Sequence, residues 1–129
     1  MKKGLLFAAL ALVALLFTGC LKSTKATVTV TVEDVNEKVV GSDVMVYMFK
    51  KSAWNGGDCK PSDASKEIPT EDDGVAIFEL SLANLEFIDN QTTLYFAVFN
   101  KEDKVIGSKS KVVKSGDNVR ITINLKEEL

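Results

Sequence analysis

A strict alternation near the amino terminus constrains the fold most strongly. Residues 27–32 read Thr-Val-Thr-Val-Thr-Val, which places every valine on one face and every threonine on the other. Residues 119–125 repeat the pattern with valine, isoleucine and leucine. β-Branched residues at a period of two are typical of a strand with one buried face. The sequence therefore predicts an all-β domain.

Seven segments of this character are separated by clusters of Asp, Asn, Gly and Pro, which favour turns. Short strands with turns at intervals of about 8–12 residues are typical of a β-sandwich. We therefore predict a seven-stranded antiparallel Greek-key β-sandwich of prealbumin or immunoglobulin type. Its strands are expected at residues 27–32, 43–49, 65–68, 75–82, 92–99, 105–113 and 119–125.

The first twenty residues predict an export signal. A Met-Lys-Lys start precedes an uncharged apolar run over residues 5–17. Spanning a bilayer takes about 20 apolar residues, so this run fits a signal peptide better. The run ends in Leu-Phe-Thr-Gly-Cys at residues 16–20, which resembles the lipobox of bacterial lipoproteins. The resemblance implies cleavage between Gly19 and Cys20, with lipid on the sulfur and the amine of Cys20.

This export signal defines a domain organisation and a location. The expected parts are a signal peptide at 1–19, the lipidated cysteine with a short linker at 20–26, and a β-sandwich at 27–129. A six-residue linker reaches at most about 20 Å, which keeps the domain near a membrane. Leu21 replaces the aspartate that resembles an inner-membrane retention signal, so the bacterial outer membrane is the expected location. A secreted chain with an incidental Cys20 is the alternative.

The composition argues against catalysis. The chain has no histidine, which removes the commonest general base and metal ligand. If Cys20 is acylated, Cys59 has no disulfide partner, and an inert or occasionally dimerising thiol is expected. The competing interpretation is a Cys20–Cys59 bridge in an unlipidated chain. Because no nucleophile–base pair or phosphate-binding glycine loop is present in the sequence, we predict a protein that is not an enzyme.

Four groups of strand and turn residues together form a family-like pattern. They are the alternating valines of 27–32, residues 38–47, residues 70–78, and Gly116 with 119–123. The pattern is similar to transthyretin-like sandwich modules, such as the carboxypeptidase regulatory-like domain and the B-type repeat of collagen-adhesin stalks. The resemblance implies a fold rather than an activity. The chain departs from it at Ser42-Asp43, where the family has a small residue followed by alanine.

Two chemistries implied by the resemblance conflict with these residues. The transthyretin-related hydrolase relies on histidines, which this chain lacks. Adhesin repeats often join a first-strand lysine to a last-strand asparagine beside a buried carboxylate. Here Asn124 and Glu79 both have the parity of outward-facing residues, and the crosslink needs all its groups desolvated together. We therefore expect neither chemistry.

Strand alternation predicts an uneven distribution of charge. Successive antiparallel strands reverse direction, so their connections alternate between two ends of a sandwich. The tethered end collects six lysines and four aspartates, including Asp58, Lys60 and Asp63, for a net charge of +2. Such an end suits an anionic membrane surface, whereas an acidic far end disfavours nucleic acid. The far end is expected to hold four lysines and the acids Glu33, Asp34, Glu37, Glu71, Asp72, Asp73, Glu102, Asp103, Glu127 and Glu128, with a net charge of −6.

Glu71, Asp72 and Asp73 form one candidate site, for Ca²⁺, because hard cations take several oxygen ligands. The competing interpretation is a solvated turn that keeps the protein soluble. The sequence contains no Asp-x-Asp-x-Asp-Gly loop, which favours the turn, and no other cofactor is expected.

Aromatic residues form a second candidate site. Tyr47, Phe49 and Tyr95 lie on predicted strands that are apolar on both faces, so both faces need cover. The loop at 50–63 carries Trp54, which either packs over these rings or lines a groove as a stacking platform for a sugar or peptide.

The predicted function is that of a non-enzymatic, membrane-tethered module that binds a partner protein or a glycan. The alternative is a structural or assembly subunit that acts by β-strand addition through an edge at residues 27–32 or 65–68.

Overall fold

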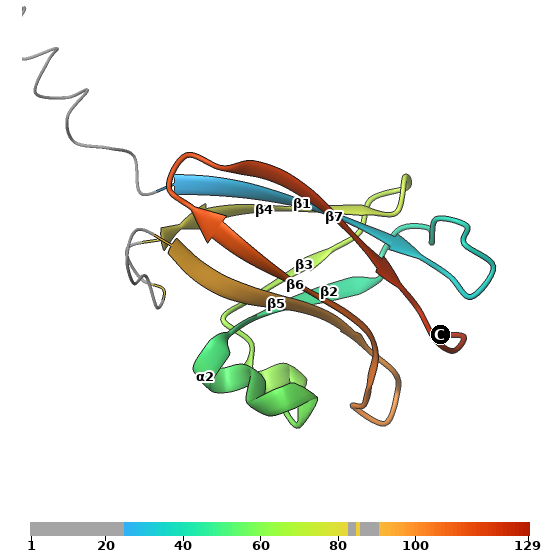
Figure 1. Cartoon of the computed structure of the whole chain (residues 1–129). Coiled ribbons are helices and arrows are strands. Elements are labelled where there is room, and N and C mark those ends of the chain that lie inside the picture. The colour runs from blue at the N-terminus through green and yellow to red at the C-terminus, as the bar shows by residue number, and fades with distance from the viewer. Residues whose placement is uncertain (1–24, 83–84, 86–90) are drawn as a thin grey trace, which may run out of the picture.

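The computed structural model describes residues 25–82, 85 and 91–129, which form a two-layer β-sandwich (Figure 1). Both ends of each strand lie within two residues of the predicted bounds. Gly19 and Cys20 lie outside the described residues, as does most of the connection between β4 and β5. Within the described residues, no helix is long and apolar enough to cross a membrane. The strands are β1 (Lys25–Glu33), β2 (Met45–Lys50), β3 (Lys66–Pro69), β4 (Val75–Ser81), β5 (Gln91–Phe99), β6 (Val105–Lys114) and β7 (Asn118–Asn124).

The strands form a three-stranded sheet in the order β4-β1-β7 and a four-stranded sheet in the order β3-β2-β5-β6. Two details of the prediction are wrong. β1 pairs with a neighbour on each side, so residues 27–32 are not an edge. β1 also pairs with β7 in parallel, whereas the other pairs are antiparallel. Successive strands alternate in direction, so the first and seventh strands run the same way. Because β1 and β7 lie side by side here, they pair in parallel.

The core is built from the inward faces of the two sheets. Val28, Val30 and Val32 of β1 are fully buried, as the alternation predicts. Phe78 of β4 and Phe96 of β5 come from opposite sheets, and their rings meet nearly edge to face with centroids 5.1 Å apart. Both rings have no exposed surface, and burying a large apolar side chain stabilises a fold by about 1.5–3 kcal/mol.

Glu79 and Asn124 are exposed on the outer face of the three-stranded sheet, as their parity predicts. Glu79 pairs with Thr27, and Asn124 pairs with Glu33. These partners lie six residues apart along β1, a separation of about 20 Å. The two side chains are therefore neither close together nor desolvated, which is the geometry expected of a sandwich without this crosslink.

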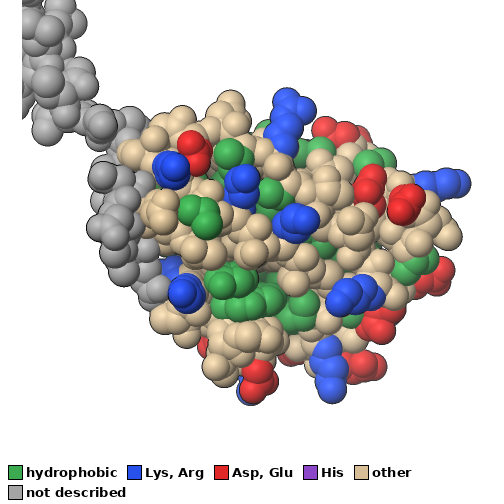
Figure 2. All heavy atoms as spheres, viewed as in Figure 1, with side chains coloured by type: hydrophobic (Ala, Val, Ile, Leu, Met, Phe, Trp, Pro, Cys, Tyr) green, Lys and Arg blue, Asp and Glu red, His purple; other side chains and the backbone are tan. Residues whose placement is uncertain are grey.

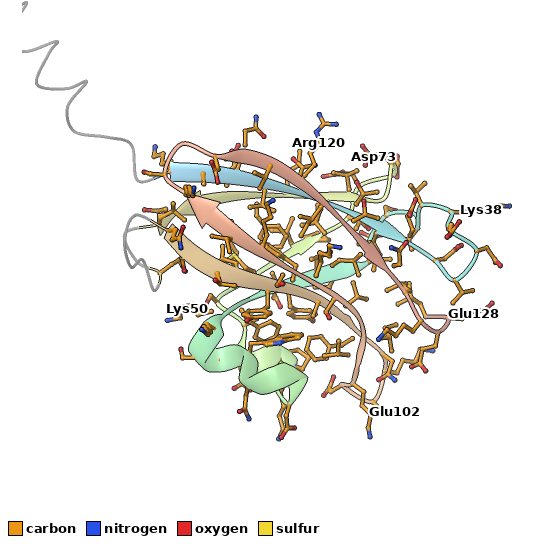
Figure 3. All side chains as sticks on the ribbon, in the orientation of Figure 1. Lys38, Lys50, Asp73, Glu102, Arg120 and Glu128 are labelled. Atoms are coloured by element: carbon orange, nitrogen blue, oxygen red, sulfur yellow. The ribbon has the colours of Figure 1, made fainter. Side chains whose placement is uncertain are left out.

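The connections alternate between two ends of the sandwich. β1 begins at the proximal end, and the segments at 34–44, 70–74, 100–104 and 125–129 gather at the opposite, distal end. Acidic side chains are frequent there, as Figure 2 shows, and Figure 3 places Asp73, Glu102 and Glu128 on that side. All ten acids predicted for the far end lie there, and Asp43 adds an eleventh.

We predict that Phe78→Ala lowers the free energy of unfolding by about 4 kcal/mol, because it removes a buried ring and leaves a cavity against Phe96. Ile77→Ala is the matched control, since Ile77 is the next residue of β4 and is 51% exposed. Its effect should stay within about 0.5 kcal/mol. Urea unfolding followed by circular dichroism measures both, and equal effects would contradict the inward and outward assignment.

Candidate functional site

Five aromatic side chains form a continuous row on the outer face of the four-stranded sheet. The row forms because β2 and β5 are neighbours, with Phe49 paired to Tyr95. From Tyr95 through Trp54, Phe49 and Phe99 to Tyr47, the ring centroids are 5.1, 5.6, 5.9 and 5.3 Å apart. The structure thus brings together the four aromatic residues that the sequence singled out, and Phe99 joins them.

The segment after β2 covers one end of this row (Figure 1). It forms α2 (Lys51–Trp54) and two short 3-10 turns, η1 (Asn55–Gly57) and η2 (Pro61–Asp63). The indole of Trp54 stacks on Tyr95 with an angle of 8° between the rings, and Phe49 beneath has no exposed surface. Trp54 therefore packs within the domain at this end, and one face of its ring is occupied.

Backbone conformation reverses this segment toward the distal end. Asn55, Gly56 and Gly57 follow one another with positive φ angles, a combination that glycine and asparagine adopt most easily. The reversal corrects the predicted charge distribution. Asp58, Lys60 and Asp63 line a groove with Glu102, Asp103 and Lys104 of the distal β5–β6 turn, instead of lying at the tethered end.

The opposite end of the row opens into a hollow of about 370 Å³ at the distal end, which we call the distal hollow. Its walls are mostly apolar, and Tyr47 and Phe99 meet there edge to face, with their rings at 88°. Two carboxylates also line it. The lining residues are Asp43, Val44, Met45, Tyr47, Pro61, Val98, Phe99, Asn100, Asp103 and Leu129.

A buried threonine holds Asp43 at the rim of this hollow. Thr70 is 3% exposed, and its hydroxyl donates to the carbonyl of Gly41 at 2.7 Å and accepts from the amide of Val44 at 3.0 Å. The backbone amide of Asp43 donates to the carbonyl of Thr70 at 2.9 Å. Asp43 has a φ of 68°, which aspartate tolerates better than most residues. The approach to β2 is therefore tied to the end of β3.

Asn100 holds Asp103 in a similar way. Its side-chain oxygen accepts hydrogen bonds from the amides of Glu102 and Lys104 at 2.9 and 3.0 Å. Its side-chain nitrogen donates to Glu127 at 2.9 Å, and the amide of Asp103 donates to the Asn100 carbonyl. This network fixes the β5–β6 turn and places Asp103, whose φ is 59°, at the hollow.

Four of the eight aspartates in the described residues accept no backbone hydrogen bond on the carboxylate, and two of these four, Asp43 and Asp103, line the hollow. Asp34, Asp63 and Asp73 each accept a hydrogen bond from a nearby backbone amide, which is the ordinary role of aspartate in a turn. In the part of the chain that the structure describes, no hydrogen bond or ion pair occupies the carboxylate of Asp43 or Asp103. Both residues line the hollow, and neither carboxylate has an internal hydrogen-bond or ion-pair partner among the described residues.

The hollow also affects Tyr47. Burial raises the pKa of the Tyr47 phenol above its ordinary value, and the negative charges of Glu67 and Asp103 raise it further. The ring thus stays neutral at physiological pH and presents an uncharged aromatic surface. The site therefore combines neutral aromatic walls with two negatively charged groups.

The predicted calcium site is not assembled. Glu71, Asp72 and Asp73 are exposed, and Asp73 accepts a hydrogen bond from the amide of Val75 at 3.2 Å. Among residues 25–82, 85 and 91–129, no group of three His, Cys, Asp or Glu side chains is placed to hold a metal ion. The three acids serve a turn between β3 and β4, where the Gly74 amide donates to the Glu71 carbonyl.

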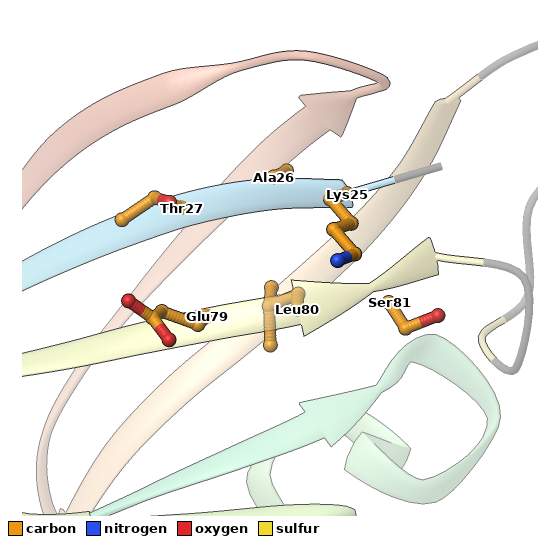
Figure 4. Close-up of a pocket in the computed structure, with 6 residues that line it drawn as sticks. All are labelled: Lys25, Ala26, Thr27, Glu79, Leu80 and Ser81. Carbon is orange, nitrogen blue, oxygen red and sulfur yellow. The ribbon is translucent and has the colours of Figure 1, made fainter. Parts of the chain in front are cut away.

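Another hollow, of about 470 Å³, lies at the proximal end between β1 and β4 (Figure 4). Lys25, Thr27, Glu79 and Ser81 contribute its polar groups.

Cys59 is half-buried and forms no disulfide among the described residues. Burial raises the pKa of its thiol, and the carboxylates of Asp63 and Asp58 raise it further. Because the thiolate is the reactive form, a raised pKa leaves less of Cys59 in that form at neutral pH.

Comparison with known proteins supports the fold. The chain is 12% identical to a minor pilin of Streptococcus agalactiae, with a TM-score of 0.51 over 84% of this chain and 47% of that one. A C-terminal shaft-pilin domain of Lactobacillus rhamnosus GG is 12% identical, with a TM-score of 0.45 over 78% of this chain and 98% of that one. The Bacillus anthracis TIE protein is 10% identical, with a TM-score of 0.45 over 78% of this chain and 16% of that one.

The likeness to the minor pilin, at 12% identity, shows the fold and nothing finer, and the chain spans about half the length of that protein. No protein-family model and no curated protein matches the chain. The likeness to the minor pilin thus agrees with the observed β-sandwich.

We predict that Trp54→Ala lowers the free energy of unfolding by about 2 kcal/mol, because it removes the stacking on Tyr95 and uncovers Phe49. Trp54→Phe should recover about half of the loss by keeping a ring over Tyr95. Chemical unfolding followed by circular dichroism measures both. A stable Trp54→Ala variant would instead mean that the loop does not cover the row.

We predict that alkylation of Cys59, in a Cys20→Ala background, has a pH midpoint above that of the unfolded chain. Asp63→Asn should lower this midpoint, whereas Asp117→Asn, which alters a similar turn elsewhere, should not. The raised pKa contributes stability below the ordinary thiol pKa, and this contribution is lost as the pH rises through the folded value. Iodoacetamide kinetics across the alkaline range give the midpoints, and identical values for folded and unfolded chains would refute the effect.

Proposed function

We propose that this chain is a lipid-anchored, non-enzymatic lipoprotein of the bacterial envelope that binds a partner protein through its distal hollow. One observation carries the proposal: the hollow opens at the end of the sandwich opposite the start of β1. A tether attached before β1 would leave this end facing away from the membrane. The acidic connections around the hollow support the same orientation.

Features of the amino-terminal side support the anchor. The lipobox-like residues 16–20 end five positions before Lys25, where β1 begins. Lys50, Lys51 and Lys114 lie at this proximal end, and basic residues near an anionic lipid surface each contribute about 1 kcal/mol of attraction. The proposed location is the outer membrane.

The aromatic row favours a protein partner over a glycan. A sugar-binding platform needs an open ring face, yet one face of Trp54 lies against Tyr95 and Phe49 is fully buried. The accessible end of the row, at Tyr47 and Phe99, instead lies beside carboxylates. This combination suits polypeptide side chains.

Strand addition is the alternative, and the edge strand β4, with Ile77 51% exposed, favours it. The edges are guarded in ways that discourage added strands. The ammonium of Lys66 on β3 donates a hydrogen bond to the Glu79 carbonyl of β4 at 2.8 Å, which occupies one backbone group of that edge strand. On the edge strand β6, Lys109 and Lys111 stand opposite the buried Phe96 and Leu94, on the inward side of the sheet. We therefore rank strand addition second.

Mass spectrometry of the membrane-extracted protein should find an acylated amino-terminal fragment beginning at Cys20. Cys20→Ala should move the protein from the membrane fraction to the soluble fraction, because the lipid is attached to Cys20. Cys59→Ala is the matched control and should remain with the membrane. An uncleaved, unmodified terminus, or equal release by both variants, would count against the anchor.

A further inference from the structure

We propose that the distal hollow binds an arginine side chain presented by a partner polypeptide. This inference rests on the proposed function, because it names the chemistry of the partner at the same site. It follows from the walls of the hollow, from its charges and from its size.

The walls suit the flat, weakly hydrated guanidinium group. Tyr47 and Phe99 meet edge to face at 88°, and both rings are partly exposed and line the hollow at the open end of the aromatic row. A guanidinium stacks on an aromatic face within about 6 Å, and its methylene stem packs on apolar surface. Met45, Val44 and Pro61 provide that surface around the rings.

The charges suit a single cation. Asp43 comes from the approach to β2, and Asp103 comes from the β5–β6 turn, so the hollow receives carboxylates from two separate connections. No lysine or arginine is among the described residues that line it. Neither carboxylate forms an ion pair within the described residues, so a bound cation could pair with both, and arginine can fork its donors between them.

The charge of the distal end and the volume of the hollow also favour an arginine side chain. With Asp58, Lys60 and Asp63 included, the distal end holds thirteen acids and five lysines, and a field of this sign draws basic partners and repels acidic ones. A hollow of about 370 Å³ lies at the small end of the range for ligand sites, which suits one side chain. Arginine is favoured over lysine because a planar fork can stack and pair at once, whereas an ammonium is a compact point charge.

The test measures binding of a fluorescent acetyl-Gly-Arg-Gly-amide peptide to the full-length chain in detergent micelles, by fluorescence anisotropy. Matching peptides carry lysine or citrulline, the latter an uncharged mimic of arginine. We expect saturable binding of the arginine peptide, weaker binding of the lysine peptide, and a loss of at least about tenfold for citrulline. Failure of the arginine peptide to bind, or equal binding of citrulline, would overturn the proposal.

Variants then locate the binding. Asp43→Asn and Asp103→Asn should each weaken binding about fivefold, and asparagine tolerates the positive φ of both positions, so the fold should survive. Glu37→Gln removes the same charge from the distal end outside the hollow and should change affinity by less than about twofold. Equal effects of all three variants would assign the binding to the general field and overturn the proposal.

A separate pair of variants tests whether the aromatic ring of Tyr47 contributes to arginine binding. Tyr47→Phe should keep the affinity within about twofold, whereas Tyr47→Leu should lose about fivefold, with thermal melts confirming that both fold. Equal affinities would overturn the stacking role. Binding in micelles does not depend on acylation, so loss of the anchor and failure of the hollow are separate outcomes: a chain without lipid at Cys20 can still bind arginine, and an anchored chain can fail to do so.

Discussion

The four-stranded sheet has to bury both of its faces, and much of the molecule depends on this constraint. β2 and β5 carry large apolar side chains on each side, and the three-stranded sheet covers only the inner one. The outer face is covered by the chain itself, through the segment that follows β2. That segment reaches from the proximal to the distal end, so it closes the aromatic row at Trp54 and leaves it open at Tyr47.

The local parts of the fold could be read from the sequence, whereas the pairing of distant segments could not. The alternation of apolar and polar residues can be seen in consecutive positions of the sequence, so the strands and their inward faces were predicted closely. The order of strands depends on contacts between residues far apart in the chain. β1 was predicted as a possible edge because no residue in 27–32 indicates that β4 and β7 pair with it on either side. The role of Gly107 also depends on a distant segment. A Cβ at this position would lie 2.8 Å from the Ile123 side chain, so glycine lets β6 approach β7.

The aromatic part of the site was predicted from local sequence patterns, whereas the part that depends on contacts between distant segments was not. Tyr47 and Trp54 stood out because aromatic residues on two-faced strands need cover. Asp43 and Asp103 were counted only as surface charge, because their placement depends on Thr70 and Asn100 through hydrogen bonds that no spacing rule reveals. One signal was available. Asp43 stands where the sequence departs from the pattern described in the sequence analysis, and the structure places this residue in the lining of the hollow.

The parallel pairing of β1 with β7 has a mechanical consequence. Seven residue pairs, from Thr27 with Asn118 to Glu33 with Asn124, join the two strands side by side. A pull applied between the start of β1 and the end of β7 would run along both strands, so their hydrogen bonds would be strained together in shear instead of peeling open one at a time. Resistance of this kind lets a domain pass tension from a surface to whatever it holds without first coming apart.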